Sequence, residues 1–376
     1  MSRILFIVEP IPSGHSGQFV LFKKLSARLA KEHQVFLASI FFDEGKRREL
    51  ESLGIKVITP ERDHLFLQKL LSYFGKDNES MLWVESWLRE GLLRKNSREL
   101  KTILKGEKFD YIINATNTVP IKAHIWWIQG PPLVRTLEDI MGDNHIVRLA
   151  LLFGRSIIER VDLNITKRNY HLSSKHIANS KYCHQIYLSI GMRIDGIVYT
   201  SSGFEDFRPT TGSPSRDYVL AYIGKETELV TLIEMAEKGI KIIGFGSKLP
   251  IGANLETLRR MIDYRGFVSR EELLSLYSNA LFTAFPFTNE PFGYVPLESI
   301  SCGTPVLTYN KQGPSETLVN GETGWLVNSS DEFVSKAVDI WKRGTTGIRA
   351  EVCVNAALPY SIENTEMCLL KFLNHS

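Results

Sequence analysis

The sequence predicts an α/β protein made of two doubly wound domains. Its 376 residues exceed the usual size of a single domain, so two hydrophobic cores are expected. Strand-like and helix-like segments alternate in the first third, which is typical of a parallel sheet with right-handed crossovers. A turn-rich stretch at 200–214 interrupts this pattern, which then restarts. We therefore predict one domain over residues 1–205 and another over residues 206–355.

The elements follow from the spacing of apolar residues, which is two in strands and between three and four in helices. Ser269 and Ser329, each followed three residues later by a glutamate, fit capping boxes that begin helices. In the first domain we expect strands at 4–8, 34–40, 56–59, 109–114, 124–128, 162–166 and 176–179, and helices at 19–30, at 45–53 and between 65 and 104. In the second we expect strands at 219–223, 240–245, 264–268 and 281–287, with helices at 228–238, 255–261 and 271–278, and we expect a last helix at 365–373 in the segment that follows this domain.

Composition narrows the function classes. The chain has 45 lysines and arginines against 42 acidic residues, so net charge gives no reason to expect a nucleic-acid partner. Its four cysteines are scattered and form no C-x-x-C pair, which favours free thiols in a reducing compartment over disulfides or a zinc site. The apolar run 4–8 is too short for a signal peptide, and no segment is long enough to span a bilayer. We therefore expect a cytoplasmic protein.

The most informative stretch is 290–298, which places Glu290 and Glu298 around a glycine turn just after a predicted strand. In open α/β sheets ligands bind at the carboxyl ends of strands, where the next helix offers free N–H groups to anions. Gly293 lets the backbone approach a phosphate-bearing ligand, and the two oxygens of Glu298 suit the hydroxyls of a ribose. The simpler alternative is two surface glutamates around a loop.

The run E-P-F-G-Y-V-P-L-E-S-I-S-C-G-T-P-V at 290–306, followed by G-P-S-E-T-L-V-N-G-E-T-G-W-L-V at 313–327, resembles the nucleotide-binding half of family 4 retaining glycosyltransferases, which are group 1 glycosyltransferases. The resemblance is weaker but collinear over the rest of the chain. It implies the GT-B fold, two Rossmann-like domains that face each other across a cleft. It also implies that segment 356–376 crosses back to pack on the first domain.

The resemblance further implies the activity. It indicates metal-independent transfer of a sugar from a UDP- or GDP-sugar, with retention, to a hydroxyl of a glycan, lipid-linked or small-molecule acceptor, and no cofactor. A nucleotide-sugar epimerase fits the motif less well, and a sugar phosphorylase would need a pyridoxal phosphate lysine motif, which we do not find. A non-catalytic nucleotide-sugar-binding or partner subunit stays open as an alternative.

Negative charge builds on the leaving diphosphate during such a transfer, and basic side chains and helix N-termini stabilise it. The resemblance assigns this role to Lys225, whose alternative is a solvated lysine at a strand end. The chain departs from the family by carrying Glu226 and Glu228 where a second lysine is usual, although Lys248 could substitute. Catalysis is assigned to Glu290 and Lys225. The further donor-binding residues are Gly17, Phe267, Val268, Phe292, Gly293, Tyr294 and Glu298.

Two candidates on the acceptor side lie in the first domain. His15 belongs to the glycine-containing loop 13–18, where backbone amides could approach a diphosphate, but a loop histidine is more often not catalytic. Gln129 occupies a position where the family commonly has a histidine. A glutamine cannot supply a proton, so we expect at most a positioning hydrogen bond from it. The alternative is a buried strand end capped by two prolines.

Apolar and basic residues interleave between 65 and 104 and again over 145–160. These stretches fit peripheral contact with an anionic membrane at its inner face, or with a lipid-linked acceptor. They fit equally well helices that bury apolar faces against the sheet and leave basic residues in solvent.

Overall fold

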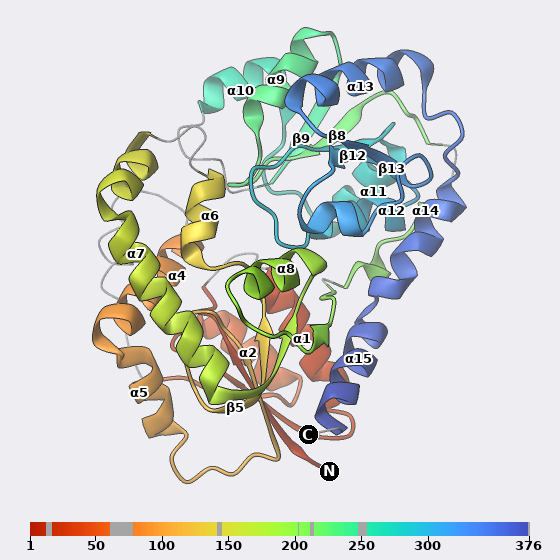
Figure 1. The fold of residues 1–376 in the computed structure, drawn as a ribbon. Helices are drawn as coiled ribbons and strands as arrows, with labels where there is room; N and C mark the ends of the chain where they lie inside the picture. Colours follow the sequence, from red (N-terminus) through yellow and green to blue (C-terminus); the bar gives the residue numbers. More distant parts are fainter. Residues whose placement is uncertain are drawn as a thin grey trace. The chain divides into compact units, whose positions relative to one another are not determined.

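A computed structural model describes residues 1–12, 17–60, 78–140, 145–201, 203–210, 214–246 and 254–374. The chain divides into two compact units, and Figure 1 shows that each has its own sheet with helices packed on it. The first unit comprises Met1–Leu137, Arg148–Ser202 and Ile362–Ser376, and the second comprises Glu138–Val147 and Gly203–Ser361. The division before Gly203 falls within the predicted turn-rich stretch.

The first unit contains a parallel sheet of seven strands in the order β3-β2-β1-β4-β5-β6-β7. Winding reverses between β1 and β4, so the loops that follow these two strands diverge and leave room for a ligand. The strands are β1 (Arg3–Val8), β2 (Gln34–Ala38), β3 (Lys56–Ile58), β4 (Tyr111–Ala115), β5 (Ala123–Ile128), β6 (Ser173–Ala178) and β7 (Gly196–Ile197).

Helices cover this sheet on both faces, which is why its strands are continuous apolar runs. One face packs on α1, and the other packs on α5 through Leu100. The helices are α1 (Gly17–Leu29), α2 (Glu44–Ser52), α4 (Asn78–Leu93), α5 (Lys95–Ile103), α6 (Leu133–Ile140), α7 (His145–Leu172), α8 (Lys181–Ser189) and α15 (Ile362–Asn374).

Helix α15 returns from the far end of the sequence to complete the first core. Leu369 and Leu373 are buried in the same cluster as the apolar face of α1. Arg28 on α1 donates to Glu363 at 2.6 Å and to Glu366 at 2.8 Å. The predicted return of the C-terminal helix to the first domain is confirmed.

The strand predicted at 162–166 is wrong, because these residues lie in the middle of α7. The stretch is rich in β-branched residues, but Val161 and Ile165 are one helical turn apart and both contact α4 at Gly91. Asp162 accepts a hydrogen bond from the Trp87 indole at 3.0 Å. Tertiary packing of this face therefore overrides the local strand preference.

In the described part of the stretch between 65 and 104, Leu82, Trp87 and Leu100 are buried, whereas Leu92 and Leu93 at the end of α4 are exposed. Trp87 packs with Leu133 and Ile165, and Trp83 and Leu88 lie against the same cluster. These side chains fit the core alternative, whereas residues 61–77 lie outside the described part of the chain.

Among the residues that the structure describes, no helix combines the length and the apolar character needed to cross a bilayer.

The second unit repeats the architecture with six parallel strands in the order β10-β9-β8-β11-β12-β13. Its winding reverses between β8 and β11. The predicted strand 264–268 is shorter than expected, since Gly266 adopts a positive φ of 69°. The strands are β8 (Val219–Tyr222), β9 (Ile242–Phe245), β10 (Asp263–Tyr264), β11 (Thr283–Phe285), β12 (Val306–Tyr309) and β13 (Gly324–Val327).

Two helices of this unit begin at the predicted capping serines. The side chain of Ser269 accepts from the N–H of Glu272 at 3.1 Å, and Ser329 accepts from the N–H of Glu332 at 3.2 Å. The helices are η2 (Phe204–Asp206), α9 (Leu229–Glu237), α10 (Leu255–Met261), α11 (Arg270–Asn279), α12 (Tyr294–Ser301), η3 (Gly313–Glu316), α13 (Ser330–Arg343), α14 (Ala350–Ala357) and η4 (Leu358–Tyr360).

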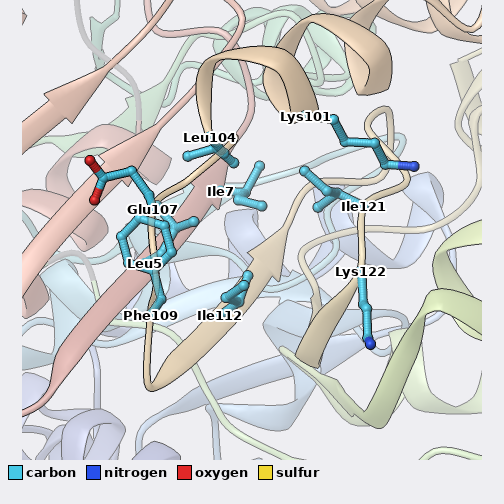
Figure 2. Close-up of a pocket in the computed structure, with 9 residues that line it drawn as sticks. All are labelled: Leu5, Ile7, Lys101, Leu104, Glu107, Phe109, Ile112, Ile121 and Lys122. Carbon is cyan, nitrogen blue, oxygen red and sulfur yellow. The ribbon is translucent and has the colours of Figure 1, made fainter.

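A cavity of about 150 Å³ lies between the first sheet and the end of α5 with the segment that follows it. Figure 2 shows the side chains that line it. Its wall is mostly aliphatic, and its carboxylate, Glu107, is paired with Arg3. None of its residues is among those predicted for the site. The lining residues are Leu5, Ile7, Lys101, Leu104, Glu107, Phe109, Ile112, Ile121 and Lys122.

The close contact of α4 with α7 predicts the effect of a small substitution. A Cβ added at Gly91 would lie 2.3 Å from the Cγ1 of Val161, a stiff side chain. We expect Gly91→Ala to lower the urea midpoint, with about 1–3 kcal/mol of overpacking exceeding the gain of about 1 kcal/mol in helix propensity. Gly154→Ala on α7 is the matched control, because its Cβ would meet only Ile158, at 3.6 Å. Equal gains in both variants would contradict the prediction.

Candidate functional site

The candidate site is built on the loops that follow β8 and β11. These neighbouring strands are in parallel register, with Leu220 opposite Thr283, so their carboxyl ends are level. The two loops are bonded to each other. Thr227 forms an isolated antiparallel β-bridge with Phe287, and the N–H of Thr288 donates to the carbonyl of Glu226 at 2.8 Å. The floor of the site at the switch point is therefore a single hydrogen-bonded surface.

A third loop, which follows β12, holds the backbone of Glu290. The N–H of Glu290 donates to the Oε1 of Gln312 at 2.7 Å, and the N–H of Gly313 donates back to the carbonyl of Glu290 at 3.2 Å. The loops touch so closely that a Cβ at Gly313 would lie 2.3 Å from the Cα of Phe292. The position of Glu290 is therefore fixed by its main chain.

The carboxyl group of Glu290 lies at the N-terminus of α12. Its Oε1 accepts from the N–H of Phe292 at 3.3 Å and of Gly293 at 3.1 Å. Burial and, after it, the nearby Glu226 raise the pKa of Glu290 to about 7, although the two N–H groups and Lys225 act in the opposite direction. Near neutral pH this group is therefore present both as acid and as carboxylate.

Gly293 is the position where only glycine fits. Its φ is +90°, and an added Cβ would lie 2.8 Å from the Cγ of Pro314 and 3.4 Å from the Cγ of Glu290. A side chain here would displace the loop that holds Glu290.

Glu298 is held inside the same unit by Tyr277 on α11, whose hydroxyl donates to Oε2 at 3.0 Å. Tyr277 is 0% exposed, so this oxygen has a fixed partner. Burial raises the pKa of Glu298 to about 7, and the Tyr277 hydroxyl and the charge of Arg270 oppose the rise. The two predicted glutamates thus flank the start of α12, with Glu290 in the loop before it and Glu298 in its second turn.

The other predicted donor residues lie around these glutamates with different exposure. Lys225 is exposed, and its charge acts on Glu290. Phe267 is 62% exposed and Val268 is 8% exposed, so the side chain of Val268 belongs to the core. Lys248 lies outside the described residues. Phe292 is buried, and its ring contacts those of Tyr294 and Tyr360.

The predicted residues of the first unit are placed as follows. Gly17 is the exposed first residue of α1, and His15 lies outside the described residues. Gln129 follows β5, where its carbonyl accepts from Asn179 at 2.9 Å and its amide donates to the carbonyl of Trp127 at 3.4 Å. Gln129 is thus engaged with neighbouring backbone and side chain.

Sequence reasoning missed Glu9, which lies at the switch point of the first sheet. It follows β1 and accepts from the N–H of Asn117 at 2.7 Å and from the hydroxyl of Thr118 at 2.5 Å, both in the loop after β4. Burial raises its pKa to about 6. An acidic residue directly after an apolar strand and before Pro10 is the signal that could have identified it.

Within the described ranges, no three histidine, cysteine, aspartate or glutamate side chains gather at one point as a metal site would require.

Residues 253–356 match the family model described as glycosyl transferases group 1. The D-inositol 3-phosphate glycosyltransferase of Mycolicibacterium smegmatis is 30% identical over 155 residues, which cover 37% of this chain and 35% of that relative. The alpha-1,3/1,6-mannosyltransferase alg-2 of Neurospora crassa is 48% identical over 56 residues, covering 15% of this chain and 12% of that one. The match thus spans about a third or less of these relatives. It confirms the predicted resemblance to group 1 glycosyltransferases.

Solved structures resemble the whole chain. Anabaena HepE in complex with UDP-glucose has a TM-score of 0.65 at 15% identity and covers 100% of both chains. WaaG, a glycosyltransferase involved in lipopolysaccharide biosynthesis, has a TM-score of 0.68 at 14% identity, covering 99% of this chain and 100% of its own. With the two parallel sheets, these likenesses confirm the predicted GT-B fold.

The half-buried position of Glu298 predicts a pH-dependent stability. Its pKa is about 7 in the folded chain and about 4.5 without burial, so folding favours the protonated form. Relative to Glu298→Gln, which does not titrate, we expect the unfolding free energy of the natural chain to fall by up to about 3 kcal/mol between pH 4.5 and 7. Above about pH 8 the difference should be constant. Urea denaturation of both proteins from pH 5 to 8 tests this, and parallel profiles would contradict it.

Proposed function

We propose that this chain, whose residues 253–356 carry the group 1 glycosyltransferase sequence, transfers a sugar from a nucleoside diphosphate sugar to a hydroxyl group, with retention of anomeric configuration. The observation that carries this proposal is the pair Glu290 and Glu298 on either side of the N-terminus of α12. This helix start lies at the switch point of the second sheet, which is where open α/β folds bind nucleotides.

Each residue of the pair has a defined role in the proposal. The Oε2 of Glu298 is held by Tyr277, so the carboxylate is oriented before the ligand arrives, and its other oxygen accepts a ribose hydroxyl. Glu290 lies beside the transferred sugar and the leaving phosphate. Lys225 and the N-terminus of α12 stabilise the diphosphate, since both present positive charge to it without a metal ion.

The retaining reaction takes place on one face of the sugar. The bond from the anomeric carbon to the phosphate oxygen breaks, and the bond to the acceptor oxygen forms on the same side. The acceptor's proton goes to the leaving phosphate. This route needs no separate protein base in the first unit, which agrees with the presence of Gln129, a residue without a titratable proton.

The donor is proposed to be a UDP- or GDP-sugar. HepE binds UDP-glucose and UDP, so uridine nucleotides are the first to test. The acceptor is proposed to be a glycan, a lipid-linked sugar or a small molecule with a free hydroxyl. Peripheral contact with an anionic membrane would suit the lipid-linked case.

Calorimetric titration with UDP, GDP and their glucose or mannose conjugates, in EDTA, tests the donor site. We expect metal-free binding of one nucleotide series, and a loss of about tenfold to a hundredfold in Glu298→Ala, because the ribose loses a charge-assisted hydrogen bond. Glu237→Ala removes an exposed carboxylate on α9 and is the matched control, with affinity unchanged. Failure of every nucleotide to bind would refute the proposed function.

The configuration of the product tests the retaining mechanism. With the donor that binds, we expect slow hydrolysis to a free sugar of the donor's own anomeric configuration, observed by proton NMR before mutarotation. The Glu290→Ala variant should lose this activity, whereas Glu237→Ala should keep it. Inverted product would exclude retention, and binding without hydrolysis or transfer would favour the non-catalytic alternative.

A further inference from the structure

Glu226 and Glu290 are acidic residues brought together at the switch point of the second sheet. The carbonyl of Glu226 accepts from the N–H of Thr288 at 2.8 Å and from its hydroxyl at 3.2 Å. Gln312 holds Glu290 from the other side at 2.7 Å. Neither backbone can move away without breaking these bonds, so the loops that carry the two residues stay together, and the charge of Glu226 acts on the carboxyl group of Glu290.

The charged groups that act on Glu290 are few. The acidic Glu226 raises its pKa and the basic Lys225 lowers it, both from the loop after β8. The charged groups on the other surrounding elements have partners elsewhere. Glu228 accepts hydrogen bonds from the hydroxyls of Tyr309 and Thr231, and Glu298 accepts one from Tyr277. Burial and, after it, the charge of Glu316 raise the pKa of Tyr360, and the Nζ of Lys311 lies 4.8 Å from the ring centre of Tyr309.

A diphosphate bound at the N-terminus of α12 would meet this pair. It carries at least two negative charges, and Lys225 supplies one positive charge against two carboxyl groups. Like charges in a poorly hydrated site repel strongly, and the repulsion is removed when one carboxyl group holds a proton. The structure places the carboxyl group of Glu290 at the start of that helix, where it accepts hydrogen bonds from the N–H groups of Phe292 and Gly293.

We propose that Glu226 and Glu290 together take up one proton when a nucleoside diphosphate binds, and that this proton serves as a hydrogen-bond donor to the phosphate. The inference rests on the proposed function, because it concerns the same diphosphate site. The proton comes from the solvent and forms an O–H bond on one carboxyl group, and no bond of the nucleotide forms or breaks in this step. Glu226 is thereby a residue that sets the affinity for the diphosphate.

Protonation also changes what the backbone can do. As a carboxylate, Glu290 occupies the N–H groups of Phe292 and Gly293. A neutral carboxyl group is a weaker acceptor, so these two N–H groups become available to donate hydrogen bonds to the phosphate oxygens. Proton uptake thus removes a repulsive charge and supplies donors to the ligand at the same time.

Calorimetric titration of the full chain with UDP, or with GDP if that is the nucleotide bound, tests the inference. Titrations at pH 7.0, 7.5, 8.0 and 8.5 in two buffers of different ionisation enthalpy count the protons taken up. The diphosphate's own ionisation, near pH 6, is complete in this range. Near pH 8 we expect the natural chain to take up close to one proton for each nucleotide bound. Its Kd for the nucleotide should rise by up to about tenfold per pH unit above pH 7.

Two variants separate this role from a structural one. In Glu226→Gln we expect little proton uptake, a flatter pH profile and tighter binding at pH 8, and in Glu226→Lys still tighter binding. If Glu226 only supported the loop, both variants would bind more weakly. Glu237→Gln, with the same change in net charge, should behave as the natural chain.

Failure of this inference and failure of the proposed function give different experimental results. Binding that depends on Glu298 but takes up no proton at pH 8 would overturn this inference and leave the proposed function intact. Proton uptake that persists unchanged in Glu226→Gln would also overturn it. If no nucleoside diphosphate binds, the proposed function and the inference both fail.

Discussion

The hydrogen bonds between the loop after β8 and the loop after β11 fix the geometry of the candidate site. The two strands are neighbours in the sheet, but their helices leave in opposite directions, so the loops would diverge without these bonds. The Thr227 to Phe287 bridge and the Glu226 to Thr288 bonds keep them together. The start of α12 therefore lies beside two loops whose backbones are held in place by hydrogen bonds.

This arrangement concentrates acidic groups where water has little access. Glu290 and Glu298 both have raised pKa values because burial penalises their charged forms, and each is held by partners within the second unit. Such groups cost stability in the absence of a ligand. A ligand whose hydroxyls donate to Glu298 and whose phosphate accepts a hydrogen bond from Glu290 would recover part of that loss in stability.

Much of the fold could be predicted from the sequence, since apolar runs and capping serines mark most elements directly. The motif at 290–298 also located the helix start correctly, because its residues are adjacent in the chain. The segment 162–166 was mispredicted, since its packing against Gly91 depends on residues about seventy positions away. Likewise, the closeness of Glu226 to Glu290 depends on strand order, which no local pattern records.

The return of α15 has a consequence for the order in which the molecule can be completed. The second unit comprises residues 138–147 and 203–361, which are all translated before residues 362–374 exist. The first unit therefore still lacks a helix after all the other segments of both units have been translated. Until Leu369 and Leu373 arrive, the part of α1 that they cover is open to solvent or to a chaperone. A nascent chain of this protein thus carries an N-terminal unit whose core stays incomplete until α15 has been synthesised.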